Sequence, residues 1–247
     1  MKENTTKVEI DSRMFNSVVS VQVDKRRYNA ILYAVKVSEN EIIPVVITSK
    51  SILKGNVTVL LNYTNSDGAI ALGSMTVPSK MWHISKNYDI GIWPCANFML
   101  AIRARGNTLT NVPLIEQMAI SKKDLLYTNL IEKTFSIGYI GSIHNDVNNW
   151  PLSYVTYTAS PITQNFDGKP YFLLNGNEPN NILGAPVFIN IAYEGRIGIR
   201  FVGMWMEQSV KTDMVGPNDF SAILKAEKII EFANKVINKI QKDEKKK

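Results

Sequence analysis

Cysteine is almost absent from this chain of 247 residues, in which Cys95 is the only one. A single cysteine excludes an internal disulfide framework and is typical of proteins in a reducing compartment. The opening residues, MKENTTKVEI, lack the apolar run of a signal peptide. No apolar stretch approaches the length needed to span a bilayer. We therefore expect a cytoplasmic protein that does not associate with membranes.

Basic residues exceed acidic ones, and the formal net charge is +6. The excess gathers at the C-terminal end, where residues 225–247 hold eight lysines and four acids and so carry +4 of the total. A basic stripe interleaved with stacking aromatic residues, which would favour nucleic-acid binding, is missing from the sequence. We expect a solvated basic tail and no nucleic-acid partner.

Short runs rich in β-branched and aromatic residues dominate the first 215 residues. Two of them are SVVSVQV (residues 17–23) and AILYAVKV (residues 30–37), and polar turn residues separate the runs. Many short strands favour an all-β barrel or sandwich over alternating strands and helices. The more polar stretch 104–123 predicts a crossover between two β-units. We place these units at residues 1–108 and 109–217.

The remaining segment, residues 218–247, has a different pattern. From Asp219 onward, apolar residues recur at positions 223, 226, 229/230, 233, 236/237 and 240. This spacing predicts an amphipathic helix with one buried stripe, followed by a basic tail. Asp219 and Ser221 offer N-cap side chains, and lysines crowd the C-terminal end, where the helix dipole favours cations. Coiled-coil pairing is the alternative to packing on the β-units, but the segment is short for it.

Several fragments resemble the trypsin-like (chymotrypsin-fold) serine peptidases, especially intracellular bacterial-type members without disulfides. VVITSKSILKG (residues 45–55) is similar to the strand and turn that carry the catalytic histidine, and YDIGIWP (residues 88–94) to the strand start that bears the catalytic aspartate. FDGKPYFLLN (residues 166–175) and ILGAPVF (residues 182–188) resemble the region around the nucleophile. Their order and joint coverage imply two six-stranded-type antiparallel β-barrels with a C-terminal α-helix.

The resemblance assigns the catalytic triad to three positions of this sequence. Asp89 matches the aspartate, Ser51 stands in place of the histidine, and Leu183 in place of the serine. Acyl transfer needs a hydroxyl activated by an imidazole whose tautomer is held by a carboxylate. Leu183 has no lone pair, and the Ser51 hydroxyl is no useful proton acceptor near neutral pH. The resemblance therefore implies a scaffold that has lost its catalysis.

The loop around Leu183 is altered as well. In the family, a glycine two residues before the serine supplies the first oxyanion-hole donor, and this sequence has Asn181 there. Asparagine adopts unusual backbone angles more readily than most residues, so the loop with Ile182 and Gly184 can keep its shape. We expect a degenerate oxyanion loop at these positions.

Together these features favour a catalytically inactive homologue, a pseudoprotease, that binds a peptide or protein and needs no cofactor or metal. The identity of the ligand and the oligomeric state stay open.

The alternative is an active hydrolase with a displaced site that uses His83 or Cys95. We expect His83 in an exposed loop, His144 in a turn-rich loop and Cys95 as an inert packed thiol. A third hypothesis is interaction through the basic C-terminal helix, with the β-units as a passive scaffold.

Trp205 follows the former nucleophile loop in the run GMWMEQ. Met204 and Met206 alternate with Trp205, so along a strand their side chains point to the opposite face. Aromatic rings most often belong to the core. If one face points away from the barrel interior, however, its apolar surface suits a peptide laid along the strand. We therefore expect Met204, Trp205 and Met206 as possible cleft residues.

Overall fold

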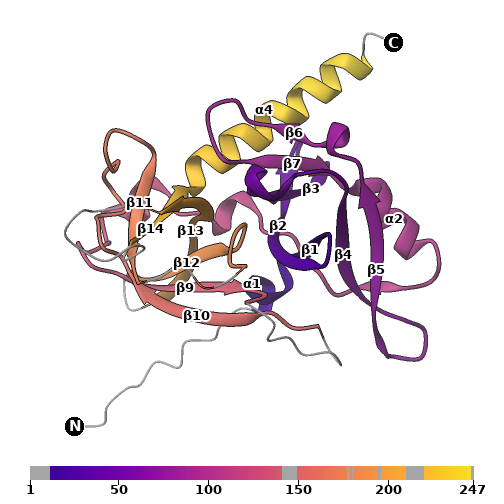
Figure 1. Cartoon of the computed structure of the whole chain (residues 1–247), viewed down its shortest axis with the longest axis horizontal. Helices are drawn as coiled ribbons and strands as arrows, with labels where there is room; N and C mark the ends of the chain where they lie inside the picture. Colours follow the sequence, from indigo (N-terminus) through magenta and orange to yellow (C-terminus); the bar gives the residue numbers. More distant parts are fainter. Residues whose placement is uncertain are drawn as a thin grey trace.

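Two antiparallel β-sheets and a long C-terminal helix make up the fold (Figure 1). The computed structural model describes residues 12–140, 149–176, 179, 181–193, 196–209 and 220–245. The mostly β architecture with a C-terminal α-helix, which the sequence predicts, is confirmed.

The first sheet holds eight strands in the order β5-β4-β1-β2-β3-β7-β6, with β8 paired to β4. Valine is frequent in β1 and β4, because its branched side chain packs well on a pleated surface, and Val21, Val57 and Val59 are fully buried. The strand bounds are β1 Val18–Val23, β2 Arg26–Lys36, β3 Ile42–Thr48, β4 Val57–Thr64, β5 Ile70–Val77, β6 His83–Ile84, β7 Gly91–Pro94 and β8 Thr108–Leu109.

The second sheet holds six strands in the order β10-β9-β12-β13-β14-β11. An antiparallel bridge between Thr158 and Leu174 joins its two end strands, and Thr156 Oγ1 donates to the carbonyl of Asn175 at 2.5 Å. These contacts bring the sheet round on itself toward a barrel. The bounds are β9 Lys133–Gly138, β10 Leu152–Tyr157, β11 Tyr171–Asn175, β12 Pro186–Tyr193, β13 Arg196–Ser209 and β14 Phe220–Lys225.

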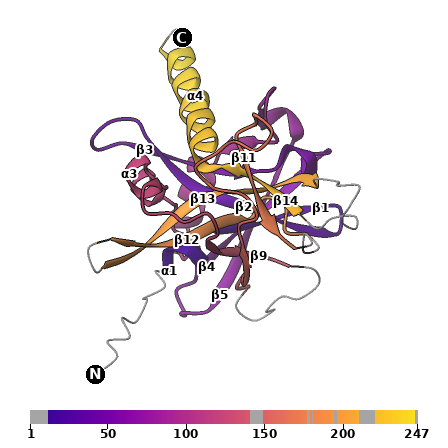
Figure 2. The same cartoon turned by 90° about the vertical axis from the view of Figure 1, so that its left-hand side faces the viewer.

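The helices lie outside the sheets, and the C-terminal end of α4 projects away from them in both views (Figure 1 and Figure 2). No helix of the described residues is long and apolar enough to cross a membrane. The α-helices are α1 Ser12–Asn16, α2 Ala96–Arg103, α3 Lys122–Leu125 and α4 Ala226–Glu244; three short 3-10 helices are η1 Lys50–Ile52, η2 Ser79–Met81 and η3 Glu116–Met118.

The C-terminal helix begins at Ala226, so the expectation of a helix from Asp219 onward is wrong. Residues 220–225 form β14, which pairs with β11 on one side and β13 on the other. Hydrogen bonding along both edges, with the four middle residues buried, outweighs the helical spacing of the apolar side chains. Ser221 is therefore a strand residue, and Lys225 takes the N-cap position without a side-chain hydrogen bond. Asp219 lies outside the described residues.

Three clusters of buried apolar side chains hold the structure together. One fills the inside of the first sheet and includes Val46 and Trp93, and another fills the inside of the second sheet around Phe172. The third lies between the sheets, where Tyr33 and Phe188 from opposite sheets join buried residues of α4 such as Ile229. Residues of both sheets and of α4 therefore pack together in this third cluster. Their packing fixes how the two halves of the molecule meet.

Candidate functional site

Ser51 and Asp89, two of the three triad-matching positions, lie next to each other. Ser51 sits in η1, directly after β3, and Asp89 lies just before β7, which pairs with β3. The backbone N–H of Ser51 donates to Oδ1 of Asp89 at 3.0 Å. Pairing of β3 with β7 therefore brings these residues together although 38 positions separate them.

Ser49 completes this cluster, and sequence reasoning missed it. Its side chain is buried, and its hydroxyl donates to Oδ2 of Asp89 at 2.5 Å. The Ser49 and Ser51 hydroxyls are also hydrogen-bonded to each other. Since Ser49 gives its single proton to Asp89, the Ser51 hydroxyl acts as the donor to Ser49. The spacing of two serines in TSKS was the signal that could have found this arrangement.

The loop that carries Leu183 approaches the same region from the second sheet. Asn181 adopts a left-handed backbone with φ of 65°, and Ile182 is fully buried. Gly184 has φ of 81°, and a Cβ there would lie 2.0 Å from the carbonyl oxygen of Asn29. Only glycine fits so close to another backbone. The half-buried Leu183 packs against the core cluster inside the first sheet, so its side chain crosses from one half to the other.

Two backbone donors of this loop have no acceptor within the described residues, namely the N–H groups of Asn181 and Leu183. The neighbouring amides are engaged: Ile182 N–H donates to the carbonyl of Pro179 at 3.1 Å, and Gly184 N–H to that of Trp205 at 3.0 Å. The two unpaired donors alternate along the loop. An oxyanion hole in serine peptidases uses amides of this kind to bind a carbonyl oxygen.

Asn29 joins the two halves behind the loop, and sequence reasoning missed this residue too. It is fully buried in β2, and its backbone N–H donates to the Leu183 carbonyl at 3.1 Å. Its side-chain amide donates to the Asn181 carbonyl at 2.7 Å and accepts from the Tyr139 N–H at 2.6 Å. Thr48 Oγ1 donates to the Asn29 carbonyl at 2.6 Å. An amide within the apolar run NAILYAV was the available signal.

Tyr171, in β11 of the second sheet, interacts electrostatically with Asp89. Its pKa is raised, first by burial, then by the negative charge of Asp89, with a further contribution from the neighbouring phenol of Tyr88. A buried phenol beside a carboxylate keeps its proton, because a second negative charge there is unfavourable. Both sheets therefore contribute to the surroundings of Asp89.

The residues proposed as an apolar cleft are buried, so that expectation is wrong. Met204 and Trp205 have no exposed surface, and Met206 is 2% exposed. The two methionines pack in the cluster between the sheets, and Trp205 lies inside the second sheet with its indole N–H donating to Ser136 Oγ at 2.7 Å. The side chains alternate as expected, but both faces are covered here. Met204 and Met206 pack in the core between the sheets, and Trp205 packs in the interior of the second sheet.

One of the two histidines, His83, lies within the described residues. His83 lies in β6, paired with Ile92, and not in the expected exposed loop. It is half-buried, and burial followed by the positive charge of Lys239 in α4 lowers its pKa. His144 lies outside the described residues.

Cys95 is confirmed as a packed thiol. It has no exposed surface, and its Sγ lies 3.9 Å from the sulfur of Met99. Burial raises the pKa of the thiol to about 12, so it stays protonated at neutral pH and is a poor nucleophile. Among the described residues, no three His, Cys, Asp or Glu side chains gather as a metal site would require.

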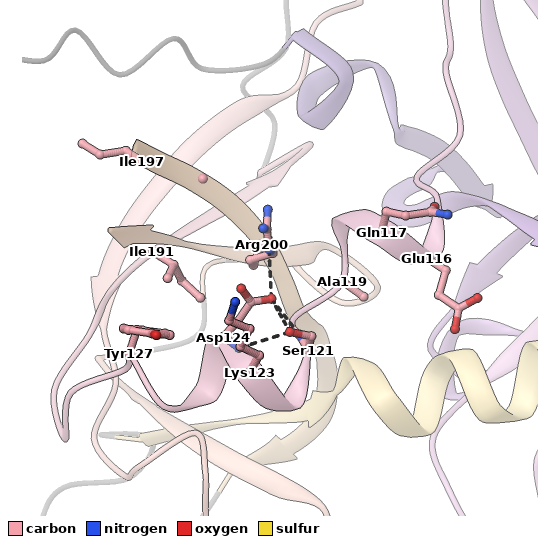
Figure 3. A pocket seen from close by; sticks show the side chains of 11 residues that line it. Glu116, Gln117, Ala119, Ser121, Lys123, Asp124, Tyr127, Ile191, Ile197 and Arg200 are labelled. Atoms are coloured by element: carbon pink, nitrogen blue, oxygen red, sulfur yellow. Dashed lines mark hydrogen bonds and ion pairs between the residues drawn. The ribbon is translucent and has the colours of Figure 1, made fainter. Parts of the chain in front are cut away.

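An open pocket of about 860 Å³ lies away from this cluster, between η3, α3 and the β12–β13 strands (Figure 3). Arg200 and Asp124 form an ion pair at its centre, with Nε to Oδ2 at 3.0 Å. Ser121, the N-cap of α3, is hydrogen-bonded to the same carboxylate. None of Ser51, Asp89 and Leu183 lines this pocket.

No protein-family model matches this chain, and no curated protein matches it. Solved structures do match. A mutant of human heparin binding protein (CAP37) is 12% identical, with 92% of this chain and 93% of that chain covered and a TM-score of 0.52. An inactive form of Rv3671c from M. tuberculosis H37Rv is 13% identical over 88% and 85% of the two chains, with a TM-score of 0.46. A thermostable serine protease, AL20, from an extremophilic microorganism is 10% identical over 90% and 99%, with a TM-score of 0.45.

The likeness to heparin binding protein extends over nearly the whole of both chains. The chain has the trypsin-like fold. At this level of identity the comparison establishes the fold alone, and fold does not imply function. Within this trypsin-like scaffold, the cluster of Ser49, Ser51 and Asp89 comes from the first sheet and the Leu183 loop from the second, and Asn29 ties them together.

Proposed function

We propose that this protein is a catalytically inactive member of the trypsin-like fold, a pseudoprotease, which binds a peptide or protein ligand. The observation that carries the proposal is the hydrogen bonding of Asp89. Its carboxylate accepts from the Ser49 hydroxyl and the Ser51 amide, where a working triad would hold an imidazole.

The chemistry of the opposite position supports the same conclusion. Leu183 is aliphatic and packs against the core of the first sheet, so no acyl intermediate can form on its side chain. The Ser51 hydroxyl donates to Ser49 and lacks the basicity to take a proton from a nucleophile. Peptidases that lack their triad keep a rate enhancement of roughly 10³ to 10⁴ over the reaction in water. This is negligible beside the rate enhancement of an intact triad.

Binding without cleavage is consistent with the loop geometry. The N–H groups of Asn181 and Leu183, which have no acceptor in the part of the chain that the structure describes, are donors for a carbonyl oxygen of a bound chain. The half-buried Leu183 side chain adds an apolar contact where a nucleophile would otherwise stand. A peptide held here would be bound by the same kind of interactions that serve catalysis in active relatives, but no bond would be broken.

The absence of activity is tested with a fluorophosphonate probe and a casein or peptide panel. We expect neither labelling nor hydrolysis by the wild type. Labelling of a serine that disappears in Asp89→Asn would contradict the proposal. The alternative with a displaced site predicts weak hydrolysis that is lost in His83→Ala or Cys95→Ala, and these two variants separate it from a contaminating protease.

Ligand binding is tested separately, by affinity capture from the native lysate. Leu183→Arg places a charge in the loop, and Leu100→Arg is the matched control, because Leu100 is 59% exposed in α2. We expect Leu183→Arg to lose a captured peptide or protein that Leu100→Arg retains. Equal capture by both variants would show that the Leu183 loop is not part of the binding site.

A further inference from the structure

The segment that follows α3 exposes an unusual number of large apolar side chains. Leu126 is 80% exposed, Leu130 73%, Ile131 67% and Tyr127 43%. Scattered exposed apolar residues are normal, but four within six positions form an apolar patch, and such patches are typical of interaction sites. We refer to residues 126–131 as the apolar loop.

Strand β10 extends this surface. Thr158, at its end, donates from its N–H to the carbonyl of Glu132 at 2.9 Å and from its hydroxyl to that of Leu130 at 3.4 Å. Val155 and Tyr157 of β10 are 45% and 49% exposed. Two tyrosines, Tyr127 and Tyr157, therefore accompany the aliphatic side chains. Aromatic rings with one polar end are the residues that membrane interfaces favour.

Hydrogen bonds within the segment pair the backbone donors of the first four residues of the loop, whereas the N–H groups of Leu130 and Ile131 have no acceptor within the described residues. Every N–H from Asp124 to Asn129 has an acceptor, at distances from 2.5 to 3.4 Å. All these acceptors belong to residues 121–132. The paired amides of residues 126–129 suit an environment of low polarity, whereas those of Leu130 and Ile131 need acceptors, which the polar headgroups of a lipid surface supply.

The acidic side chains of this region accept hydrogen bonds, and two of its lysines are exposed. Asp124 accepts from Arg200 and Ser121 (Figure 3), and Glu132 accepts from the backbone and side-chain amides of Asn129. Lys122 and Lys133 are exposed and form no ion pair within the described residues. Nζ of Lys133 lies 5.5 Å from the ring centroid of Phe135. The surface around the apolar loop therefore presents two exposed positive charges, those of Lys122 and Lys133.

We propose that the apolar loop docks on an anionic lipid surface. Leu126, Leu130 and Ile131 enter the boundary between headgroups and acyl chains, and Lys122 and Lys133 lie at the level of the phosphates. Side chains exposed by two thirds or more project from the protein, and a fluid bilayer accepts them without a matching pocket. The sequence alone predicts no membrane association, because these residues never form a long apolar run.

Vesicle co-sedimentation tests the proposal with the full chain. Vesicles of phosphatidylcholine alone are compared with vesicles that also contain phosphatidylglycerol. We expect binding to the anionic vesicles, and its loss by roughly tenfold or more in the triple variant Leu126→Ser/Leu130→Ser/Ile131→Ser. The matched control is Ile42→Ser/Leu100→Ser, which removes side chains that are 56% and 59% exposed elsewhere. Lys122→Gln/Lys133→Gln should weaken binding only to anionic vesicles, as should added salt.

Insertion is measured directly with Leu130→Trp. On anionic vesicles the added indole should shift its emission to the blue and be quenched by brominated acyl chains, relative to wild type under the same conditions. This readout decides the matter even if the triple variant fails to fold. Absence of binding, unchanged binding by a folded triple variant, or absence of quenching would overturn the proposal. So would a dimer in light scattering that the triple variant abolishes, because the loop would then contact a second copy.

Discussion

Asn29 and Leu183 are joined across the two sheets by a hydrogen bond of 3.1 Å from the Asn29 N–H to the Leu183 carbonyl. The Asn29 side chain adds further bonds from the same buried position, to Asn181 and Tyr139. The Leu183 loop is therefore attached to the first sheet by the backbone and the side chain of one residue.

Loss of the Asn29 side chain should destabilise the protein strongly. Asn29→Ala leaves the Tyr139 N–H and the Asn181 carbonyl without their partner, and each unsatisfied buried group costs about 1–3 kcal/mol. We expect a loss of roughly 3 kcal/mol in the free energy of unfolding, measured in urea. Asn40→Ala, at an exposed position, is the control and should stay within about 0.5 kcal/mol of wild type. Equal small effects would show that Asn29 is no attachment point.

Gly184→Ala separates a steric clash from a conformational penalty. At Gly184 a Cβ would lie 2.0 Å from the Asn29 carbonyl oxygen, whereas Gly55, with a similar φ of 91°, has nothing within 4 Å. The left-handed backbone alone costs alanine about 1–2 kcal/mol. We expect Gly55→Ala to lose about that much in thermal or chemical unfolding, and Gly184→Ala to lose several kcal/mol more. Similar losses in the two variants would argue against the close approach.

Catalytic groups placed back at the three positions should restore reactivity if the scaffold is intact. Ser51→His and Leu183→Ser supply the base and the nucleophile, and Ser49→Ala removes the hydroxyl that donates to Oδ2 of Asp89. We expect the triple variant to react with a fluorophosphonate, measured by mass spectrometry, because residue 51 keeps its backbone bond to Asp89. Each single variant should stay unlabelled. An unreactive but folded triple variant would mean that the loop at Leu183 has changed beyond the triad.

The half-buried position of His83 predicts a pH dependence of stability. Burial and Lys239 lower its pKa, so the unfolded chain, whose histidines titrate at about 6.5, binds this proton more readily than the folded one. The unfolding free energy should therefore fall as the pH drops through about 6.5 toward the lower pKa of folded His83. Well above about pH 6.5, His83 should make no contribution to the pH dependence. His83→Gln should remove this part of the slope, measured by urea unfolding across the range. His144→Gln, the other histidine, should keep it; an unchanged slope in His83→Gln would refute the assignment.

Much of the fold follows from local patterns that the sequence carries by itself. Short runs rich in valine and isoleucine, such as the one around Val21, predict strands, because branched side chains suit a pleated surface. The helical spacing from Ala226 predicts α4 for the same kind of local reason. The hypothesis that Ser51 and Leu183 stand at triad positions also arises at this level, because it rests on a sequence resemblance and on residue identity alone.

Tertiary structure decided the rest, because it depends on which elements meet. Residues 220–225 carry a helical spacing but form a strand, since two neighbouring strands were available to pair with them. Met204 and Trp205 alternate as predicted, yet no pattern could show that both faces of β13 would be covered. The roles of Ser49 and Asn29 likewise come from partners 40 and 152 positions away, so only folding brings the donors and acceptors together.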